Sequence, residues 1–116
     1  MTRAAITGHP NPGSVWVTLK YHQDPGHGWV ETTRAELLRL GLADQISTYS
    51  YVLGDPSDAD ATVYLEEDCD APKLTAALEA EGRKVRLCPL PVEFDHPIRS
   101  LRRYVARTSI LFPQAA

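Results

Sequence analysis

SVWVTLKYH, residues 14–22, decides the fold, because apolar and polar residues alternate in it without interruption. A period of two predicts a β-strand. One face would carry Val15, Val17, Leu19 and Tyr21, and the other Trp16, Thr18, Lys20 and His22. Residues 23–28 follow directly and contain one Pro and two Gly, which favour a chain reversal. We therefore expect a hairpin in which residues 29–31 return beside this strand.

Two helices are predicted by the residues at their ends. Thr33-Arg34-Ala35-Glu36 matches a capping box, in which the Thr hydroxyl accepts a hydrogen bond from the backbone amide three residues later. This first helix would end at Gly41. Asp70 predicts the cap of a second helix that ends at Gly82. Pro72 suits its first turn, where the amide needs no partner.

Three further strands are predicted between and after these helices. Residues 49–53 and 61–67 alternate again, and residues 84–93 form the last apolar segment of this kind. Pro89 and Pro91 cannot donate to a strand ladder, so they either place this last strand at a sheet edge or shorten it. A short strand at residues 3–7 would have to end before the turn-forming cluster at 9–13.

The C-terminal part of the chain is predicted to hold a third helix. Asp95-His96-Pro97 has the pattern of a helix start. On a helix, the apolar and basic residues would separate onto two faces, with Ile98, Leu101 and Val105 on one and Arg99, Arg102, Arg103 and Arg107 on the other. The apolar residues 110–112 either pack onto the domain or offer a surface to a partner.

These elements predict an α+β fold. The simplest architecture is a mostly antiparallel sheet of four to five strands with two to three helices on one face. A split βαβ, ferredoxin-like arrangement is one way to connect them. The 116 residues have the length of a single domain spanning 1–116, and we expect 1–13 and 109–116 to be loose termini.

Composition narrows the location and the partners. The formal net charge of −3 gives no overall attraction to nucleic acid or to an anionic membrane, so any such binding needs a local patch. The sequence contains no apolar run of membrane-spanning length, and it does not begin like a secretory signal. We expect a cytoplasmic protein that makes no membrane contact. Cys69 and Cys88 are too few and too widely spaced for a disulfide framework or a zinc ribbon.

The strongest concentration of charge is acidic. Residues 55–70 contain seven carboxylates and no Lys or Arg. Within this run we single out an acidic patch of Glu66, Glu67, Asp68 and Asp70. Oxygen ligands of this kind can hold Mg²⁺ or Ca²⁺, with Asp58, Asp60 and Asp68 as candidate ligands. The run lacks the EF-hand order of ligands, and we favour the simpler explanation, a solvated loop leading into a helix N-terminus.

Basic and aromatic residues supply the other candidate binding groups. Residues 96–116 carry four Arg and no acid. Arg99, Arg102 and Arg103, with Tyr104 beside them, could contact phosphates, an acidic protein surface or the carboxylates of the chain itself. Trp16 and Trp29 could be exposed interface anchors, although both could equally be core residues.

Catalytic and metal-binding signals are weak by comparison. His22, Asp24 and His27 lie around the predicted hairpin turn and could hold a zinc ion, but no fourth ligand is evident. The sequence contains no nucleophile elbow and no phosphate-binding glycine loop. Acidic neighbours should disfavour the Cys69 thiolate. We therefore nominate no catalytic residue, no metal site and no cofactor, and favour a non-enzymatic protein.

Three segments, taken together, resemble a family of small uncharacterised bacterial and phage or mobile-element proteins. The segments read GHGWVE at 26–31, YLEEDCD at 64–70 and IRSLRRY at 98–104, and the ADQIS and YSY segments at 43–51 lie between them. No activity is known for that family, so the resemblance implies a mobile-element accessory role and lends no catalytic residue.

Three functions remain open from the sequence. The leading expectation is an interaction module that binds a host protein or forms a homodimer through Trp16, His27, Trp29 and the arginines together with Tyr104. The second is a nucleic-acid-binding regulator that uses the C-terminal arginines. The third is a metal-dependent hydrolase built on residues 55–70.

Overall fold

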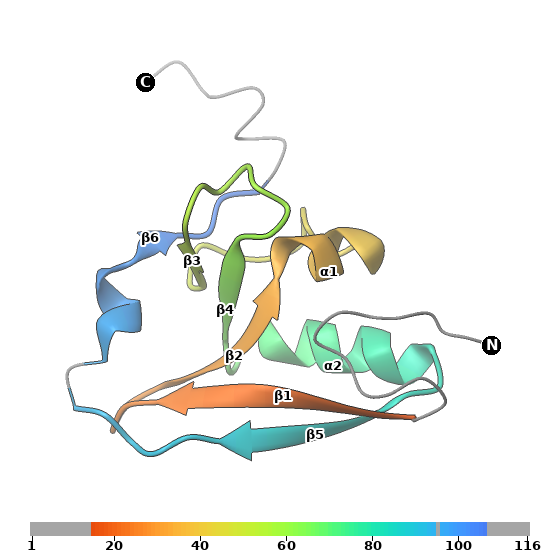
Figure 1. The fold of residues 1–116 in the computed structure, drawn as a ribbon, viewed down its shortest axis with the longest axis horizontal. Coiled ribbons are helices and arrows are strands. Elements are labelled where there is room, and N and C mark those ends of the chain that lie inside the picture. Colours follow the sequence, from red (N-terminus) through yellow and green to blue (C-terminus); the bar gives the residue numbers. More distant parts are fainter. Residues whose placement is uncertain (1–14, 95, 107–116) are drawn as a thin grey trace.

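The computed structural model describes residues 15–94 and 96–106. This part of the chain forms six strands, two α-helices and one 3₁₀ helix, and Figure 1 shows how they are arranged. The strands are β1 (Trp16–Gln23), β2 (Gly28–Thr33), β3 (Tyr51–Leu53), β4 (Thr62–Glu66), β5 (Lys84–Pro89) and β6 (Arg102–Arg103). The helices are α1 (Arg34–Arg39), α2 (Ala71–Ala80) and the 3₁₀ helix η1 (Pro97–Ser100).

The strands form one mixed sheet in the order β5-β1-β2-β4-β3-β6. β5 pairs parallel to β1, and the other pairs are antiparallel. The predicted α+β class is confirmed, and the sheet is mostly antiparallel as predicted, but in the described chain it has six strands rather than four to five and includes one parallel pair. Since β1 leads directly into β2, the element order also differs from the β-α-β-β-α-β order of ferredoxin-like folds.

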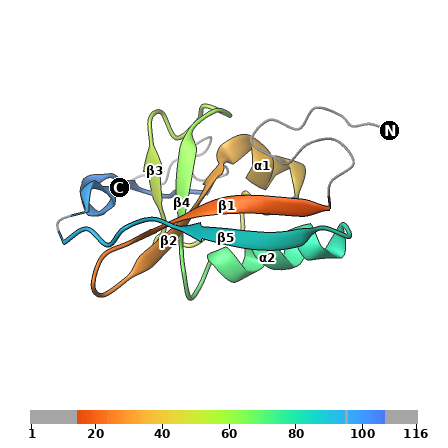
Figure 2. The same cartoon turned by 60° about the horizontal axis from the view of Figure 1, so that its bottom comes forward.

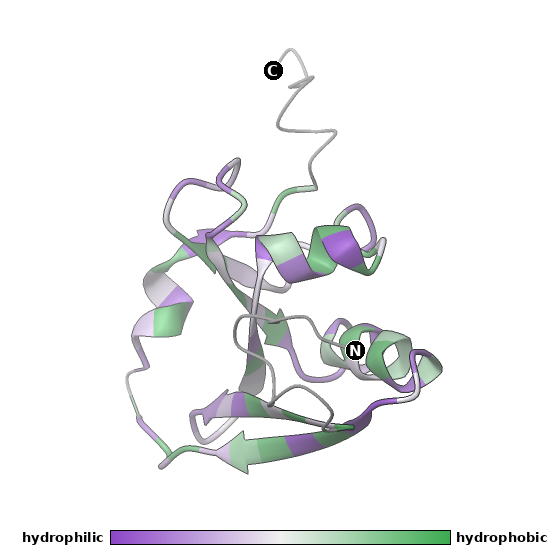
Figure 3. Ribbon diagram, turned by 45° about the vertical axis from the view of Figure 1, so that its right-hand side comes forward, coloured by the Kyte–Doolittle hydropathy of each residue, from purple (hydrophilic) through white to green (hydrophobic). Residues whose placement is uncertain are grey.

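Both α-helices cover the same face of the sheet, as Figures 2 and 3 show. The main core lies in this layer, where Leu37 of α1 and Leu74 of α2 pack with residues such as Val17 and Val63 of the sheet. η1 lies on the opposite face (Figure 1), where Ile98 packs against Trp29 and Tyr51. Each face of the sheet therefore has its own apolar cluster.

The predicted helix ends are largely confirmed. The Thr33 hydroxyl accepts a hydrogen bond from the Glu36 amide at 3.2 Å, and α1 begins at the next residue after Thr33. Gly41 and Gly82 follow the two helices with φ angles of 73° and 87°, a region that favours glycine. Asp70 precedes α2, but its side chain makes no cap hydrogen bond, because it points into a buried cluster instead.

The predicted edge position of the last strand is confirmed, since β5 is the first strand in the sheet order. Successive N–H groups along a strand point to opposite sides. The Leu90 N–H donates to the Tyr21 carbonyl of β1 at 2.9 Å, so the missing N–H of Pro89 would have pointed away from β1. The proline therefore costs the sheet no ladder bond.

The predicted C-terminal helix is wrong. Of the described residues 96–106, only 97–100 are helical, as the 3₁₀ helix η1, and Arg102–Arg103 form β6 beside β3. The reason lies in two buried side chains. Ile98 packs on the η1 face of the sheet, whereas Tyr104 belongs to the core on the helix face. A chain that crosses the sheet edge in extended form can bury both, and a continuous helix on one face cannot.

Several predictions fall outside the described residues. These are the short strand at 3–7, the loose termini at 1–13 and 109–116, and the apolar segment at 110–112. None of the described helices is long and apolar enough to cross a membrane.

Candidate functional site

A pocket of about 410 Å³ opens at the end of the sheet where β4 leads into α2. It collects residues from the hairpin turn, the acidic segment and the C-terminal arginines, which are far apart in sequence. The lining residues are His27, Trp29, Tyr49, Tyr51, Glu66, Asp68, Cys69, Arg99 and Arg103. We refer to this set as the binding pocket.

The floor of the binding pocket is aromatic. Trp29 is only 2% exposed, and its ring centroid lies 6.3 Å from that of Tyr51 in an edge-to-face arrangement. Ile98 packs behind both rings and completes the small apolar cluster. Tyr49 is 60% exposed and forms an aromatic edge of the pocket. Since Trp29 and Tyr51 are themselves buried, the accessible aromatic surface of the pocket is that of Tyr49.

Arg99 and Arg103 stand over this floor. The Arg99 guanidinium carbon is 5.4 Å from the Trp29 ring centroid, and that of Arg103 is 4.9 Å from the Tyr51 centroid. Both distances are in the range of cation–π contacts. Arg103 Nη1 also donates to the Thr48 carbonyl at 3.0 Å. The two guanidinium groups are thus held by ring contacts and by one polar anchor each.

The polar anchor of Arg99 is the buried carboxylate of Asp24, which accepts from its Nε. Asp24 also accepts from the backbone amides of Gly26 and His27. The hydrogen bond from Arg99, followed by these amides, lowers the pKa of Asp24 to about 2 in spite of its burial. The carboxylate therefore stays ionised and largely neutralises the Arg99 charge.

Carboxylates form the other side of the binding pocket. Glu66 Oε1 accepts from the backbone amides of Asp68 at 3.0 Å and Cys69 at 2.7 Å, which fixes the turn between β4 and α2. Asp68 and Cys69 are exposed. Local desolvation and the Glu66 carboxylate raise the pKa of the Cys69 thiol, which disfavours its thiolate as the sequence predicts. A nucleophilic role for Cys69 is therefore unfavourable.

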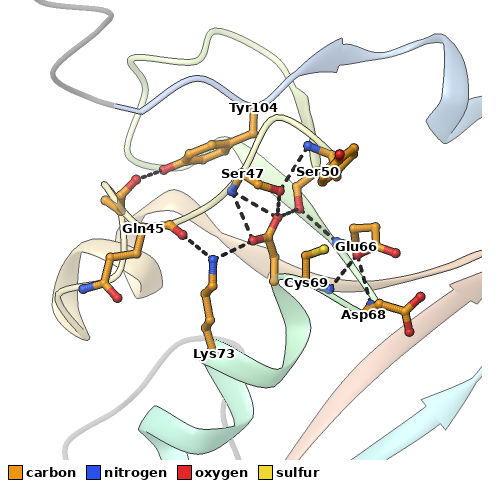
Figure 4. A network of polar contacts seen from close by, with 11 residues as sticks. Gln45, Ser47, Ser50, Glu66, Asp68, Cys69, Lys73 and Tyr104 are labelled. Carbon is orange, nitrogen blue, oxygen red and sulfur yellow. Dashed lines mark hydrogen bonds and ion pairs between the residues drawn. The ribbon is translucent and has the colours of Figure 1, made fainter.

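A buried polar network supports the pocket from behind (Figure 4). Asp70 has no exposed surface and accepts hydrogen bonds from the Ser47 amide, the Ser47 and Ser50 hydroxyls and the Lys73 ammonium. The Ser50 hydroxyl in turn accepts from the Glu66 amide at 2.9 Å. Because these bonds connect the loop before β3 to the start of α2, they hold Tyr49 opposite the acidic turn.

The structure brings six of the predicted site residues together and places five elsewhere. His27, Trp29, Glu66, Asp68, Arg99 and Arg103 line the binding pocket. Tyr104 is a core residue whose hydroxyl donates to the Ala43 carbonyl, and Asp70 belongs to the buried network. Glu67 accepts from the Tyr21 hydroxyl. Arg102 is exposed on β6, and Trp16 lies on β1 near β5.

The sequence left open whether the C-terminal arginines pair with the acidic patch. The ion pairs of the described residues include no contact of Arg99, Arg102 or Arg103 with Glu66, Glu67 or Asp68. Arg99 pairs with Asp24 instead. The arginines also do not form a helical stripe, because the segment that carries them is η1 followed by β6.

Residues 15–94 and 96–106 contain no group of three or more His, Cys, Asp or Glu side chains that could hold a metal ion. The hairpin residues are engaged elsewhere, since His22 Nε2 lies 2.7 Å from Glu31 Oε1 and Asp24 binds Arg99. In the acidic run, Asp58 accepts from the Asp60 amide at 2.9 Å and so closes a local turn. These contacts agree with the structural explanation of both segments.

Asp24, Ser47 and Ser50 were not nominated from the sequence as supports of a site. Asp24 and Arg99 are 75 positions apart, and Ser47 and Asp70 are 23 apart, so no spacing rule connects them. Tyr49 and Tyr51 carried only the general signal of an aromatic pair at a strand start.

No protein-family model, curated protein or solved structure matches this chain. The function therefore has to be inferred from the chemistry of the site.

Proposed function

We propose that the chain is a non-enzymatic interaction module whose binding pocket holds a short segment of a partner protein. The observation that supports this most directly is the combination, in one opening, of a buried aromatic floor with charges of both signs. Interfaces gain most of their affinity from aromatic anchors that become buried on binding, and they use the surrounding charges to select the partner. Tyr49 can supply such an anchor because it is 60% exposed.

The charges favour a partner segment with a basic side chain. Arg99 is neutralised by Asp24, whereas Glu66 and Asp68 have no cationic partner among the ion pairs of the described chain. A lysine or arginine of the partner could place its charge between these carboxylates and its apolar stem along Tyr49. Arg103 would then be available for a backbone carbonyl or carboxylate of the same segment.

The surroundings of the pocket support binding rather than catalysis. Its thiol is disfavoured as a nucleophile, because desolvation and Glu66 raise the pKa of Cys69. A phage or mobile-element accessory that binds a host protein, or a second copy of itself, fits this proposal and rests on the sequence resemblance alone.

Photocrosslinking tests the proposal. A photoreactive amino acid at Tyr49, which is exposed at the pocket rim, should give a crosslinked product in the native host. The same group at Glu79, exposed near the far end of α2, is the matched control. Mass spectrometry identifies the product, and a mass twice that of the chain identifies the partner as a second copy.

Charge reversal shows whether the product depends on the pocket. Asp68→Lys should reduce the Tyr49 crosslink at least about tenfold, the effect of about 1.4 kcal/mol on binding. Asp58→Lys makes the same change in the same acidic run but outside the pocket and should leave the crosslink unchanged. Equal crosslinking from Tyr49 and Glu79, or equal yields for both charge reversals, would contradict the proposal.

A further inference from the structure

A second surface lies on the half of β1 that β2 does not reach. β1 pairs with β2 only through Tyr21, His22 and Gln23, whereas residues 16–21 all pair with β5. Residues 16–20 of β1 and the strand β5 therefore form a two-stranded ribbon. Figure 2 shows the two strands side by side above α2. Val17 and Leu19 on one face of this ribbon are buried against the helix layer.

The opposite face of the ribbon is exposed. By strand alternation and register, it carries Trp16, Thr18, Lys20, Lys84, Arg86 and Cys88, all of which are exposed. We call these six residues the ribbon face. Three of them are cations and none is a carboxylate, although the whole chain has a net charge of −3. The ribbon face is thus a local basic surface on an acidic protein.

Trp16 lies among these cations. It is 39% exposed, in contrast to Trp29, which is 2% exposed in the other apolar cluster. The Arg86 guanidinium carbon is 4.4 Å from the Trp16 ring centroid, and Lys84 Nζ is 5.6 Å from it. Both cations therefore lie over the indole ring, and a base can stack only on the part of the ring that stays exposed to solvent.

We infer that the ribbon face binds single-stranded nucleic acid. Proteins that bind single strands without sequence preference combine an aromatic side chain, on which a base stacks, with cations that follow the phosphates. Trp16 provides the aromatic surface, and Lys20, Lys84 and Arg86 provide the cations within about 13 Å, the length of four strand residues. This function is separate from the proposed protein binding, because no residue of the ribbon face lines the binding pocket.

A single strand fits this surface better than a duplex does. The bases of a duplex are already stacked on one another, so an indole on a flat strand pair has no free base to contact. An acidic protein or an anionic membrane would use the three cations but would not require stacking on Trp16. Quenching of the indole therefore separates these partners from a single-stranded nucleic acid.

The test uses the intrinsic fluorescence of the full-length chain, which has only two tryptophans. Because Trp29 is buried, quenching by added oligothymidine of twelve nucleotides reports on Trp16. We expect saturable quenching at micromolar concentration in 50 mM salt. Three phosphate contacts predict a slope of about −2 for log K against log salt, which is a loss of about 20-fold between 50 and 200 mM.

Variants locate the binding surface, with anisotropy of a labelled oligothymidine as a readout that does not depend on tryptophan. Trp16→Ala should weaken binding at least about fivefold, whereas Trp16→Phe should keep most of the affinity because a phenyl ring still stacks. Arg86→Ala should reduce the salt slope by about 0.7. Arg102→Ala removes an exposed arginine from the opposite end of the sheet and should change neither value.

The inference is overturned by three results. The first is absence of saturable quenching in 50 mM salt. The second is a variant result in which Arg102→Ala weakens binding and Arg86→Ala does not. That result would place the contact at the C-terminal arginines. The third is tighter binding to phosphatidylserine vesicles or to polyglutamate than to oligothymidine. Circular dichroism of each variant confirms that a loss of binding is not a loss of fold.

Discussion

Replacement of the buried Asp70 by Asn should destabilise the protein strongly. The carboxylate is fully buried and accepts from Ser47, Ser50 and the Lys73 ammonium. The amide has nearly the same shape, but it carries no charge and offers only one acceptor oxygen. Removing one partner from a buried charged network costs about 3–5 kcal/mol, which is a large part of the 5–15 kcal/mol typical of a domain.

Urea unfolding at pH 7, followed by circular dichroism, measures this loss. With a slope of about 2 kcal/mol per molar urea, the midpoint should fall by about 2 M. Asp68→Asn is the matched control, because the same change is made two positions away on an exposed side chain. If the free energies of unfolding of the two variants differ by less than about 0.5 kcal/mol, the network does not hold the loop to α2 as described.

The pH dependence of the same pair of proteins provides a second check. Burial opposes ionisation of Asp70, but the hydrogen bonds from Ser47, Ser50 and Lys73 outweigh it and hold the pKa below the ordinary value of 3.8. A pKa lowered by folding means stability that is present above pH 3.8 and is lost as the pH falls through the folded value. The gap between wild type and Asp70→Asn should therefore narrow below about pH 4.

Three further changes have defined outcomes. Arg34→Met should raise the free energy of unfolding by about 1–3 kcal/mol, because Nε and Nη2 of the buried Arg34 have no hydrogen-bond partner in the described part of the chain and only Nη1 donates, to Tyr104. A lower melting temperature of the variant would show that the Arg34 charge is compensated. Gly28→Ala should lower the free energy of unfolding by about 1–3 kcal/mol, since an added Cβ overlaps the Tyr21 ring. If urea unfolding shows no such loss, the Tyr21 ring can move away freely. Wild type should lose free energy of unfolding between pH 3.8 and about 2, where protonation of Asp24 breaks the ion pair with Arg99, and Asp24→Asn should not show this loss. If the two proteins lose stability equally over this pH range, the pKa shift of Asp24 is contradicted.

Local signals explain the parts of the fold that the sequence predicted. The alternation in residues 14–22, the Thr33 cap and the glycines after both helices act within a few residues, so no knowledge of the remaining chain is needed. The edge position of β5 was predictable for the same reason, because proline lacks a donor wherever it lies.

The C-terminal segment shows where local signals fail. The spacing of Ile98, Leu101 and Val105 fits a helix, but the structure buries Ile98 and Tyr104 on opposite faces of the sheet. Which face a side chain meets is decided by tertiary packing, and packing overrides helical periodicity. The parallel pairing of β1 with β5 has the same origin, since its register depends on the path of α2 across the sheet.

The binding pocket was predicted only in part. Its charged and aromatic groups stand out in the sequence because arginines, carboxylates and tryptophans are conspicuous there. The supporting roles of Asp24 and Asp70 were not predicted, because the sequence offered Asp24 as a candidate zinc ligand and Asp70 as a helix cap in an acidic patch. A polar side chain that is buried by distant residues gives no signal in its own neighbourhood.

The parallel pairing of β1 with β5 has a consequence for synthesis of the chain. While the ribosome has made only the segment through β4, residues 16–20 of β1 lack their ladder partner β5, and Val17 and Leu19 lack the apolar residues that α2 adds to their core cluster. Such an unfinished strand can recruit a strand of another nascent chain. Rapid translation of residues 67–89 would shorten this exposure, and slow translation there should increase the fraction of product that aggregates.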